Sequence, residues 1–294
     1  MGDPPRLEAG RARAVIDPAG AQLRRWTVGG RDLLWSPDPN VWDAVAPVLF
    51  PVVGWTRNGE VRVGSESYPL GLHGFARARE FHVADRGADT VTLIDRADPD
   101  TRRSYPFDYE IEIEFRLGED RLSCHARVRN AGGGPMPYAF GLHPGFRWPG
   151  GPARIVFDHA EAPRVPVITR DGLFAPERRA IPLRGRGLAL SSELMAAEAL
   201  CFLDIRSRGL LYETDGFGRL RVALDDFPHV ALWSRPPAPF LCIEAWTGHG
   251  DPADFAGDLF QKPSMRVLPP GGSARHGATW TFEPDGVHSA TGSP

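Results

Sequence analysis

A strict alternation of apolar and charged side chains over residues 109–117 constrains the fold more than any other feature. From Tyr109 to Leu117 every odd position is apolar, and every even position carries a glutamate or Arg116. Because successive side chains of a β-strand point to opposite faces, this run predicts a strand with one buried and one solvated face. The alternation resumes after residues 118–120 and continues to Arg129, so the two runs together predict a β-hairpin.

The rest of the chain is rich in short β-like runs that are separated by Gly and Pro. No long segment shows a helical apolar repeat, and the best candidates for short helices are residues 192–199 and 252–259. No internal repeat of about 20 to 50 residues is visible, which argues against a propeller or a solenoid. The pattern predicts an all-β sandwich or barrel with few short helices. The further strands are expected at residues 12–16, 22–28, 90–95, 155–157, 200–205, 220–224, 230–233, 240–244 and 279–282.

The length and composition suit one large domain. We expect a single domain over residues 1–294, with a frayed tail from about residue 283. With 42% hydrophobic and 24% charged residues, the chain has the composition of a globular protein with a large core. Cys124, Cys201 and Cys242 are odd in number and show no CxxC spacing, so we expect reduced, buried thiols rather than disulfides or a thiolate zinc site.

Charge and hydropathy exclude several classes of partner. A net charge of −3 and a pI near 6.3 give no basic footprint for nucleic acid or for an anionic membrane surface, so a small diffusible ligand fits better. The N-terminus lacks an apolar leader segment, and no stretch approaches the roughly 20 apolar residues that span a bilayer. We therefore expect a cytoplasmic protein. Lys262, the only lysine, lies in neither a P-loop nor a recognisable Schiff-base context.

Common catalytic motifs are missing, since the sequence contains no HExxH, GxSxG, P-loop or EF-hand pattern. Five polar residues nevertheless stand in unusual surroundings of Gly, Pro and aromatic residues: Arg57, His73, Arg77, His143 and Glu244. Each also has an ordinary structural explanation. The glutamate could end a strand facing solvent, the histidines could be satisfied structural residues, and the arginines could be surface charges. Their local sequence alone does not decide between these alternatives.

Five segments resemble, in their amino-acid sequence and in their order along the chain, those of the aldose 1-epimerase (galactose mutarotase) family. Within that family they are most similar to a bacterial branch that includes proteins similar to hexose-6-phosphate 1-epimerases. The resemblance spans roughly residues 15–282, and the joint occurrence of the segments in this order is specific. The segments are VLFPVVGWTRNGE (48–60), YPLGLHGFARAREF (68–81), YPFDYEIEIEFRL (105–117), VRNAGGGPMPYAFGLHPGF (128–146) and FLCIEAWTG (240–248).

The resemblance implies a single large β-supersandwich that binds a sugar in a cleft on its concave face. It implies no cofactor, and ligand spacing does not suggest a metal site. It further implies the following roles: Glu244 as general base, His143 as general acid, His73 and Arg57 as sugar-binding and charge-stabilising residues, Arg77 as the arginine of the HGFAR motif, and Asp204 as a residue that grips sugar hydroxyls, with a poorer local match. Two positions depart from the family pattern, because Gly145 replaces a usual aromatic residue and Ala245 a frequent proline.

The implied activity is interconversion of the α and β anomers of a free or phosphorylated hexose. Opening a pyranose ring needs a base for the proton of the C1 hydroxyl and an acid for the ring oxygen, and a Glu–His pair can serve as both. A nearby carboxylate is expected to keep His143 protonated, and a nearby Arg57 to keep Glu244 charged. Aromatic residues such as Trp55, Phe75, Phe146 or Trp246 could pack against the apolar face of the sugar.

Three alternatives stay open at this point. The nearest is a hexose-6-phosphate 1-epimerase, in which Arg57, Arg77 or Arg79 would bind the phosphate. A non-catalytic carbohydrate-binding protein of the same fold is a second, although such a protein has no need of an acid–base pair. A glycoside hydrolase is a third, but it would normally need two carboxylates, and only Glu244 has a supporting context. The expected partner is a small-molecule sugar or sugar phosphate, bound by a monomer or a homodimer.

Overall fold

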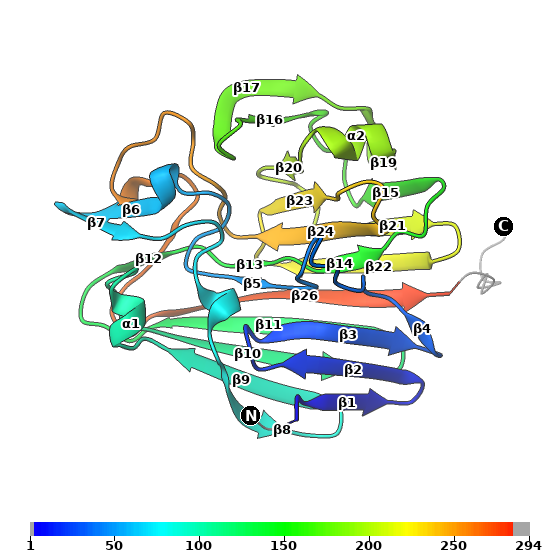
Figure 1. Cartoon of the computed structure of the whole chain (residues 1–294), viewed down its shortest axis with the longest axis horizontal. Coiled ribbons are helices and arrows are strands. Elements are labelled where there is room, and N and C mark those ends of the chain that lie inside the picture. The colour runs from blue at the N-terminus through cyan, green and yellow to red at the C-terminus, as the bar shows by residue number, and fades with distance from the viewer. Residues whose placement is uncertain (1–2, 285–294) are drawn as a thin grey trace.

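The computed structural model of the chain describes residues 3–284, and β-strands dominate it (Figure 1). Within these residues there are two α-helices, both short: α1 (Pro99–Arg102) and α2 (Ser192–Ala197). The predicted all-β class with few short helices is confirmed. Most of the predicted tail, residues 285–294, lies outside the described residues.

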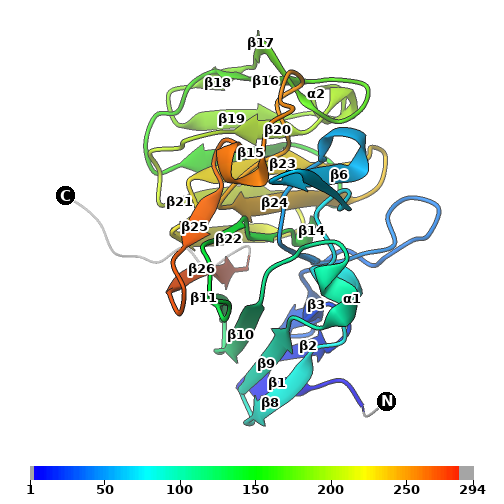
Figure 2. The ribbon, with the colours of Figure 1, turned by 90° about the vertical axis from the view of Figure 1, so that its left-hand side faces the viewer.

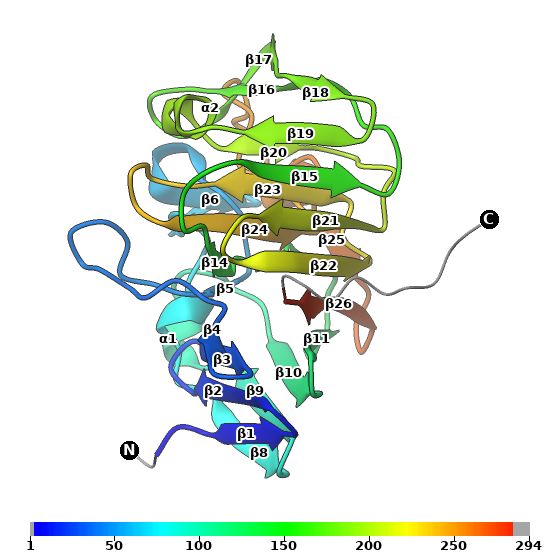
Figure 3. The ribbon, with the colours of Figure 1, turned by 90° about the vertical axis from the view of Figure 1, so that its right-hand side faces the viewer.

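The largest sheet has ten antiparallel strands, which follow one another in order from the top to the bottom of the view in Figure 3. The predicted hairpin is part of it as β10 and β11, with Tyr109 opposite Asn130 and Leu117 opposite Leu122. The apolar residues of β10 are buried on one face, as the alternation predicts. The strands across the sheet are β18 (Leu183–Arg184), β19 (Gly187–Leu190), β15 (Ala153–Phe157), β21 (Gly209–Thr214), β22 (Gly218–Asp225), β26 (Ser273–Glu283), β11 (Arg121–Asn130), β10 (Tyr109–Leu117), β9 (Thr90–Arg96) and β8 (His82–Arg86).

A second sheet of six short strands is layered on the first (Figure 2). Its central strand is β24, in which every residue is buried. The strands are, in order, β20 (Leu200–Phe202), β23 (His229–Trp233), β24 (Phe240–Trp246), β13 (Gly141–Leu142) and β5 (Val48–Leu49), and β14 (Gly145–Arg147) also pairs with β24.

The remaining strands form a small N-terminal sheet and three two-stranded pairs. In Figure 2 the N-terminal sheet covers the lower end of the large sheet beside β8, β9 and β10. Three single-turn 3₁₀ helices lie in the connections. The elements are β1 (Arg6–Ala9), β2 (Ala12–Asp17), β3 (Gln22–Val28) and β4 (Arg31–Asp32) of the sheet; the pairs β6 (Glu60–Val63) with β7 (Glu66–Pro69), β12 (Met136–Tyr138) with β25 (Arg266–Leu268), and β16 (Arg164–Ile168) with β17 (Phe174–Ala180); and η1 (Arg57–Gly59), η2 (Ala76–Ala78) and η3 (Leu259–Gln261).

One large apolar cluster joins the three larger sheets. It includes Trp26 of β3, Ile113 of β10 and Ile243 of β24, all of them buried. Because side chains of one face of each sheet meet in this cluster, the sheets pack as a sandwich around a shared core. The three cysteines are free and buried, as predicted.

The structure departs from the predicted elements at a few places. The helix predicted at residues 192–199 is confirmed as α2, but residues 252–259 form turns and coil, and only η3 begins at their end. The strand predicted over residues 200–205 ends at Phe202 because Asp204 has a positive φ of 55°. Helix α1 was not predicted; a capping box formed by Asp98 and Thr101 stabilises its single turn.

Candidate active site

The two faces of β24 serve different purposes. Three residues of one face, Leu241, Ile243 and Ala245, belong to the main core. The opposite face of the same strand presents a carboxylate between two small apolar clusters, with Phe240 and Cys242 on one side and Trp246 on the other. The alternation of side chains along a strand therefore fixes Glu244 on the face of the second sheet that is turned away from the main core.

Neighbouring strands bring a histidine to this carboxylate. Leu142 of β13 pairs with Ala245, and Gly145 of β14 pairs with Cys242, so the short break between β13 and β14 lies beside Glu244. His143 occupies this break. Its Nε2 lies 3.3 Å from Oε1 of Glu244. The two residues that the resemblance names as acid and base are thus in direct contact, although they come from distant parts of the sequence.

Glu244 is an almost completely buried carboxylate. Its exposed fraction is 3%, and that of His143 is 7%. The indole Nε1–H of Trp246 donates a hydrogen bond of 3.1 Å to Oε2, so both carboxylate oxygens have a polar contact. The alternative of a glutamate that faces solvent at a strand end is therefore wrong.

Burial sets the protonation of this pair. Desolvation raises the pKa of Glu244 well above its ordinary value, and the hydrogen bond from Trp246 only partly opposes this. Desolvation lowers the pKa of His143 to about 3, and the positive charge of Arg77 acts in the same direction. Both directions are the reverse of those expected from the sequence. Burial therefore disfavours the charged form of each group, and it favours a protonated Glu244 beside a neutral His143 over the ion pair.

His73 stands next to His143 in a strained turn. Its φ is +63°, and its ring centroid lies 5.6 Å from that of His143 at an interplanar angle of 86°. Its Nδ1 accepts a 3.1 Å hydrogen bond from the backbone N–H of Gly54, so a neutral His73 carries its proton on Nε2. Burial, followed by the charges of His143 and Arg77, lowers the pKa of His73 well below its ordinary value. His73 therefore presents a neutral donor beside the pair.

The two predicted arginines are less directly connected to this pair. Arg77 is exposed in η2, and its charge reaches both histidines. Arg57 is also exposed; its backbone N–H donates to Asp251 (2.8 Å) and its guanidinium to the carbonyl of Ala253. Among the described residues, no hydrogen bond or ion pair joins Arg57 to Glu244 or His143.

Asp204 follows β20 at the edge of the same sheet. Its side chain is 85% exposed, and its backbone N–H donates a 3.0 Å hydrogen bond to Nδ1 of His229. His229 lies opposite Trp246 in the strand register, and Nε2 of its ring lies 2.9 Å from the hydroxyl of Ser264. Burial lowers the pKa of His229 to about 4, so its ring is neutral near pH 7. Asp204 is thus placed near the outer face of β24 but not in contact with Glu244.

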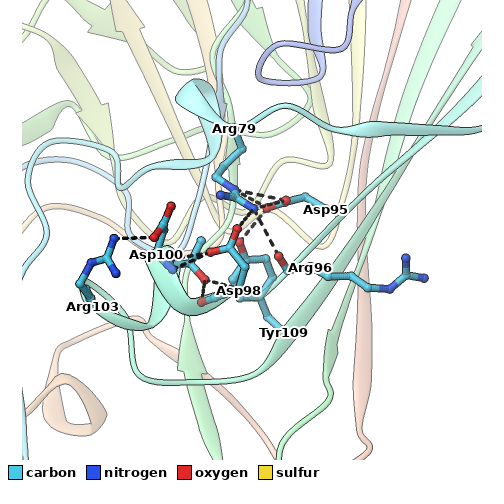
Figure 4. Close-up of polar contacts among 8 residues, drawn as sticks. Arg79, Asp95, Arg96, Asp98, Asp100, Arg103 and Tyr109 are labelled. Atoms are coloured by element: carbon cyan, nitrogen blue, oxygen red, sulfur yellow. Dashed lines mark hydrogen bonds and ion pairs between the residues drawn. The ribbon is translucent and has the colours of Figure 1, made fainter.

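Arg79, one of the arginines considered for phosphate binding, is engaged elsewhere (Figure 4). Its guanidinium forms ion pairs of 2.9 Å with Asp95 and 2.8 Å with Asp98. Asp95 is almost completely buried and also accepts a 2.7 Å hydrogen bond from the hydroxyl of Tyr109. Arg79 is therefore part of a structural ion-pair cluster at the start of α1.

Several residues near the site were not predicted. Trp42 and Trp233 pack around His143, and the ring of Trp42 lies 5.2 Å from the imidazole. Lys262 is buried and forms an ion pair with Asp251, whose other oxygen binds the Arg57 backbone. The only sequence signal for this pair was that Lys262 is the single lysine. Trp42 lies in a loop without any pattern that could have revealed it.

Residues 3–284 contain neither a group of metal-binding side chains nor a membrane-spanning helix. Within them, no three His, Cys, Asp or Glu side chains are grouped so that they could hold a metal ion. None of the helices described there is long and apolar enough to cross a membrane.

Comparison with known proteins decides the family. A family model described as aldose 1-epimerase matches residues 6–171, more than half of the chain. The chain belongs to the aldose 1-epimerase family. Protein LacX of Lactococcus lactis subsp. lactis is 28% identical to it over 257 residues, which cover 82% of this chain and 86% of LacX. The resemblance found in the sequence is therefore confirmed. Glu244 lies beyond residues 6–171, so the match to the family model does not include it.

Solved structures agree with this result. A galactose mutarotase related enzyme from Lactobacillus acidophilus is 28% identical and superposes with a TM-score of 0.87, covering 95% of this chain and 97% of that one. A galactose mutarotase-like protein from Lactobacillus casei ATCC 334 reaches a TM-score of 0.89 at 24% identity, with coverages of 95% and 99%. This member of the aldose 1-epimerase family therefore has the galactose mutarotase-like sandwich fold.

Proposed function

We propose that this protein is an aldose 1-epimerase that interconverts the α and β anomers of a hexose by acid–base ring opening and closure. The observation that carries the proposal is the buried contact of 3.3 Å between Nε2 of His143 and Oε1 of Glu244. A carboxyl group and an imidazole in contact in a buried site form a suitable acid–base pair for moving protons between two oxygens of one substrate.

Glu244 and His143 can make both proton transfers that the reaction needs. In the ion-pair form, the Glu244 carboxylate takes the proton of the C1 hydroxyl while the protonated imidazole of His143 gives its proton to the ring oxygen. The bond between C1 and the ring oxygen breaks, and C1 becomes an aldehyde carbon. Rotation about the C1–C2 bond then presents the other carbonyl face, and the reverse transfers close the ring as the opposite anomer.

The protonation states of the pair match the two halves of this cycle. After ring opening, Glu244 carries a proton and His143 is neutral. Burial favours this same arrangement, because it raises the pKa of Glu244 and lowers that of His143. The site thereby supports the open-chain aldehyde state. When the ring closes, Glu244 gives its proton to the carbonyl oxygen at C1, and His143 takes the proton of the C5 hydroxyl.

The surrounding residues would hold the sugar. His73 offers a neutral Nε2–H donor beside the pair, and the exposed Arg77 contributes positive charge near both histidines. Arg57 and Asp204 lie farther out, where they could bind more distant hydroxyl groups. Such a combination of a few polar groups with aromatic side chains is typical of sugar sites.

We propose a free hexose rather than a hexose 6-phosphate as substrate. A phosphate needs uncommitted cationic donors, and Arg79 is held by Asp95 and Asp98. The guanidinium of Arg57 already donates to the carbonyl of Ala253. Arg77 alone is a weaker basis for phosphate binding than a cluster of arginines.

The test is to follow the interconversion of freshly dissolved α-anomers by polarimetry or exchange NMR. Glucose, galactose and glucose 6-phosphate are compared with the wild type, with Glu244→Gln and with buffer alone. We expect the wild type to accelerate a free hexose most, and the variant to lose this acceleration. If the wild type accelerates none of the sugars, the proposal is wrong; preference for glucose 6-phosphate would overturn the choice of a free hexose.

A further inference from the structure

A loop between β4 and β5 brings a tryptophan to the edge of the acid–base pair. In Figure 3 this loop projects from the body of the molecule. The ring of Trp42 lies 5.2 Å from that of His143, 5.4 Å from that of Trp233 and 5.4 Å from that of Phe240. Trp42 and Trp233 are partly exposed, whereas His143 and Phe240 are buried. Two partly exposed indole rings therefore border the buried imidazole.

Gly145 provides the place where Trp42 rests. It pairs with Cys242 in the register of β14 and β24, two positions along β24 from Glu244. A Cβ atom at Gly145 would lie only 2.6 Å from Cζ3 of Trp42, which is closer than real Cβ atoms approach other heavy atoms. The φ of Gly145 is not in the positive region that favours glycine. The packing of Trp42, and not the backbone conformation, is therefore what requires glycine here.

The loop is held in this position by several hydrogen bonds. The N–H of Gly145 donates to the carbonyl of Val45 at 2.8 Å, and the carbonyl of Gly145 accepts from the N–H of Trp35 at 2.9 Å. The guanidinium of Arg235 donates to the carbonyl of Val41, next to Trp42, at 2.7 Å. Trp42 is therefore preorganised next to the pair.

We propose that Trp42 forms an aromatic wall of the sugar site and that Gly145 is the seat that allows it. A pyranose presents C–H groups on one face of its ring, and an indole face can pack against them. With the sugar stacked in this way, C1 and the ring oxygen are held beside Glu244 and His143. Trp42 is then a specificity-determining residue, which selects aldopyranoses that present C–H groups on one face of the ring. This inference rests on the proposed epimerase function and deepens it.

The test compares Trp42→Phe, Trp42→Leu, Gly145→Ala and the double variant Trp42→Leu/Gly145→Ala. The exposed Phe260→Ala serves as the control. For the preferred hexose we expect Trp42→Leu to raise KM about tenfold, equivalent to about 1.4 kcal/mol, with kcat nearly unchanged. Trp42→Phe keeps a ring face and should raise KM only about twofold. Gly145→Ala displaces the indole and should resemble Trp42→Leu.

The double variant separates the seat from an independent effect. If Gly145→Ala acts only by displacing Trp42, the double variant binds no worse than Trp42→Leu alone. If the two substitutions raise KM in the double variant by the product of their separate factors, the proposed role of Gly145 is wrong. An unchanged KM in a Trp42→Leu variant with wild-type circular dichroism and melting temperature would overturn the wall.

Sugar binding by calorimetric titration keeps the two proposals apart. The Kd of wild type and Trp42→Leu for the same hexose reports on the wall without any turnover. Equal Kd values would refute the wall even if the wild type is an active epimerase. A weaker Kd for the variant would support the wall even if the wild type shows no turnover, in which case only the proposed function fails.

Discussion

Replacement of Glu244 by glutamine tests the site most directly, because it removes the titratable carboxyl group and keeps the shape of the side chain. The amide oxygen of a glutamine can still accept the hydrogen bond from Trp246, which is 3.1 Å long in the native protein. The amide NH₂ can donate to Nε2 of a neutral His143, now 3.3 Å from a carboxylate oxygen. The variant therefore keeps the polar contacts of the pair but cannot take a proton from the sugar.

The expected activity follows from the loss of the base. A positioned general acid or base contributes about 10²–10⁴-fold to a reaction rate, so we expect kcat of Glu244→Gln to fall by this factor. KM should change little, because the shape of the site and its hydrogen bonds are retained. Glu114→Gln on the solvated face of β10 is the matched control and should leave kcat unchanged.

The same substitution should stabilise the protein as the pH rises. Burial raises the pKa of Glu244, so its folded state binds the proton more tightly than the unfolded state does. The resulting stability is fully present below the unfolded pKa of about 4.5 and is lost as the pH rises through the folded pKa. Glutamine does not titrate and escapes this loss, so the stability of Glu244→Gln relative to wild type should increase from pH 5 to pH 8.

Exchange NMR at the C1 position and urea unfolding at both pH values measure the two effects on one variant. Loss of activity together with a gain in stability at pH 8 is characteristic of a functional buried carboxylate. Two results would refute the reasoning: a kcat within tenfold of the wild type, or a relative stability that decreases from pH 5 to pH 8.

Three further predictions follow from other charged groups. The pH profile of kcat/KM, corrected for buffer catalysis, should fall at acid pH only near the His143 pKa of about 3, and it should fall again as the pH rises through the raised pKa of Glu244, because the active pair holds one proton; an acidic limb near 6.5 would contradict the burial of His143. Lys262→Met leaves a buried, unpaired Asp251 and should destabilise the protein by about 3–5 kcal/mol in urea unfolding, with partial recovery in the double variant with Asp251→Asn. Arg79→Met should cost on the order of 2 kcal/mol of stability, because Asp95 loses its partner, while KM for glucose 6-phosphate stays constant; an increase of that KM would place Arg79 in a phosphate site.

The sequence was most informative where a strand has one wet and one dry face. The hairpin of β10 and β11 was predicted correctly because its alternation records burial directly. Strand β24 extends two residues beyond its prediction, to Trp246, because both of its faces are buried and no alternation marks its end. The single-domain organisation stays a prediction; the main core cluster, which extends from Leu7 to Phe282, supports it.

The site could be predicted in its residue types but not in its electrostatics. Short motifs around His143 and Glu244 pointed to both residues, but a linear sequence does not show that they touch. It also could not show that both are buried, which reverses the expected direction of their pKa shifts. Arg57 was expected to keep Glu244 charged, and in the structure its guanidinium binds the carbonyl of Ala253.

Trp42 also affects the acid–base pair, because its ring limits the access of water to His143. The low pKa of His143 results mainly from desolvation, and the ring of Trp42 is one of the groups that exclude solvent from the imidazole. Removing the indole in Trp42→Leu admits water and should raise the pKa of His143 from about 3 towards its ordinary value of 6.5. The acidic limb of the pH profile should then move to higher pH in this variant but not in Phe260→Ala. An unmoved limb would mean that other groups, such as Trp233, keep His143 dry without Trp42.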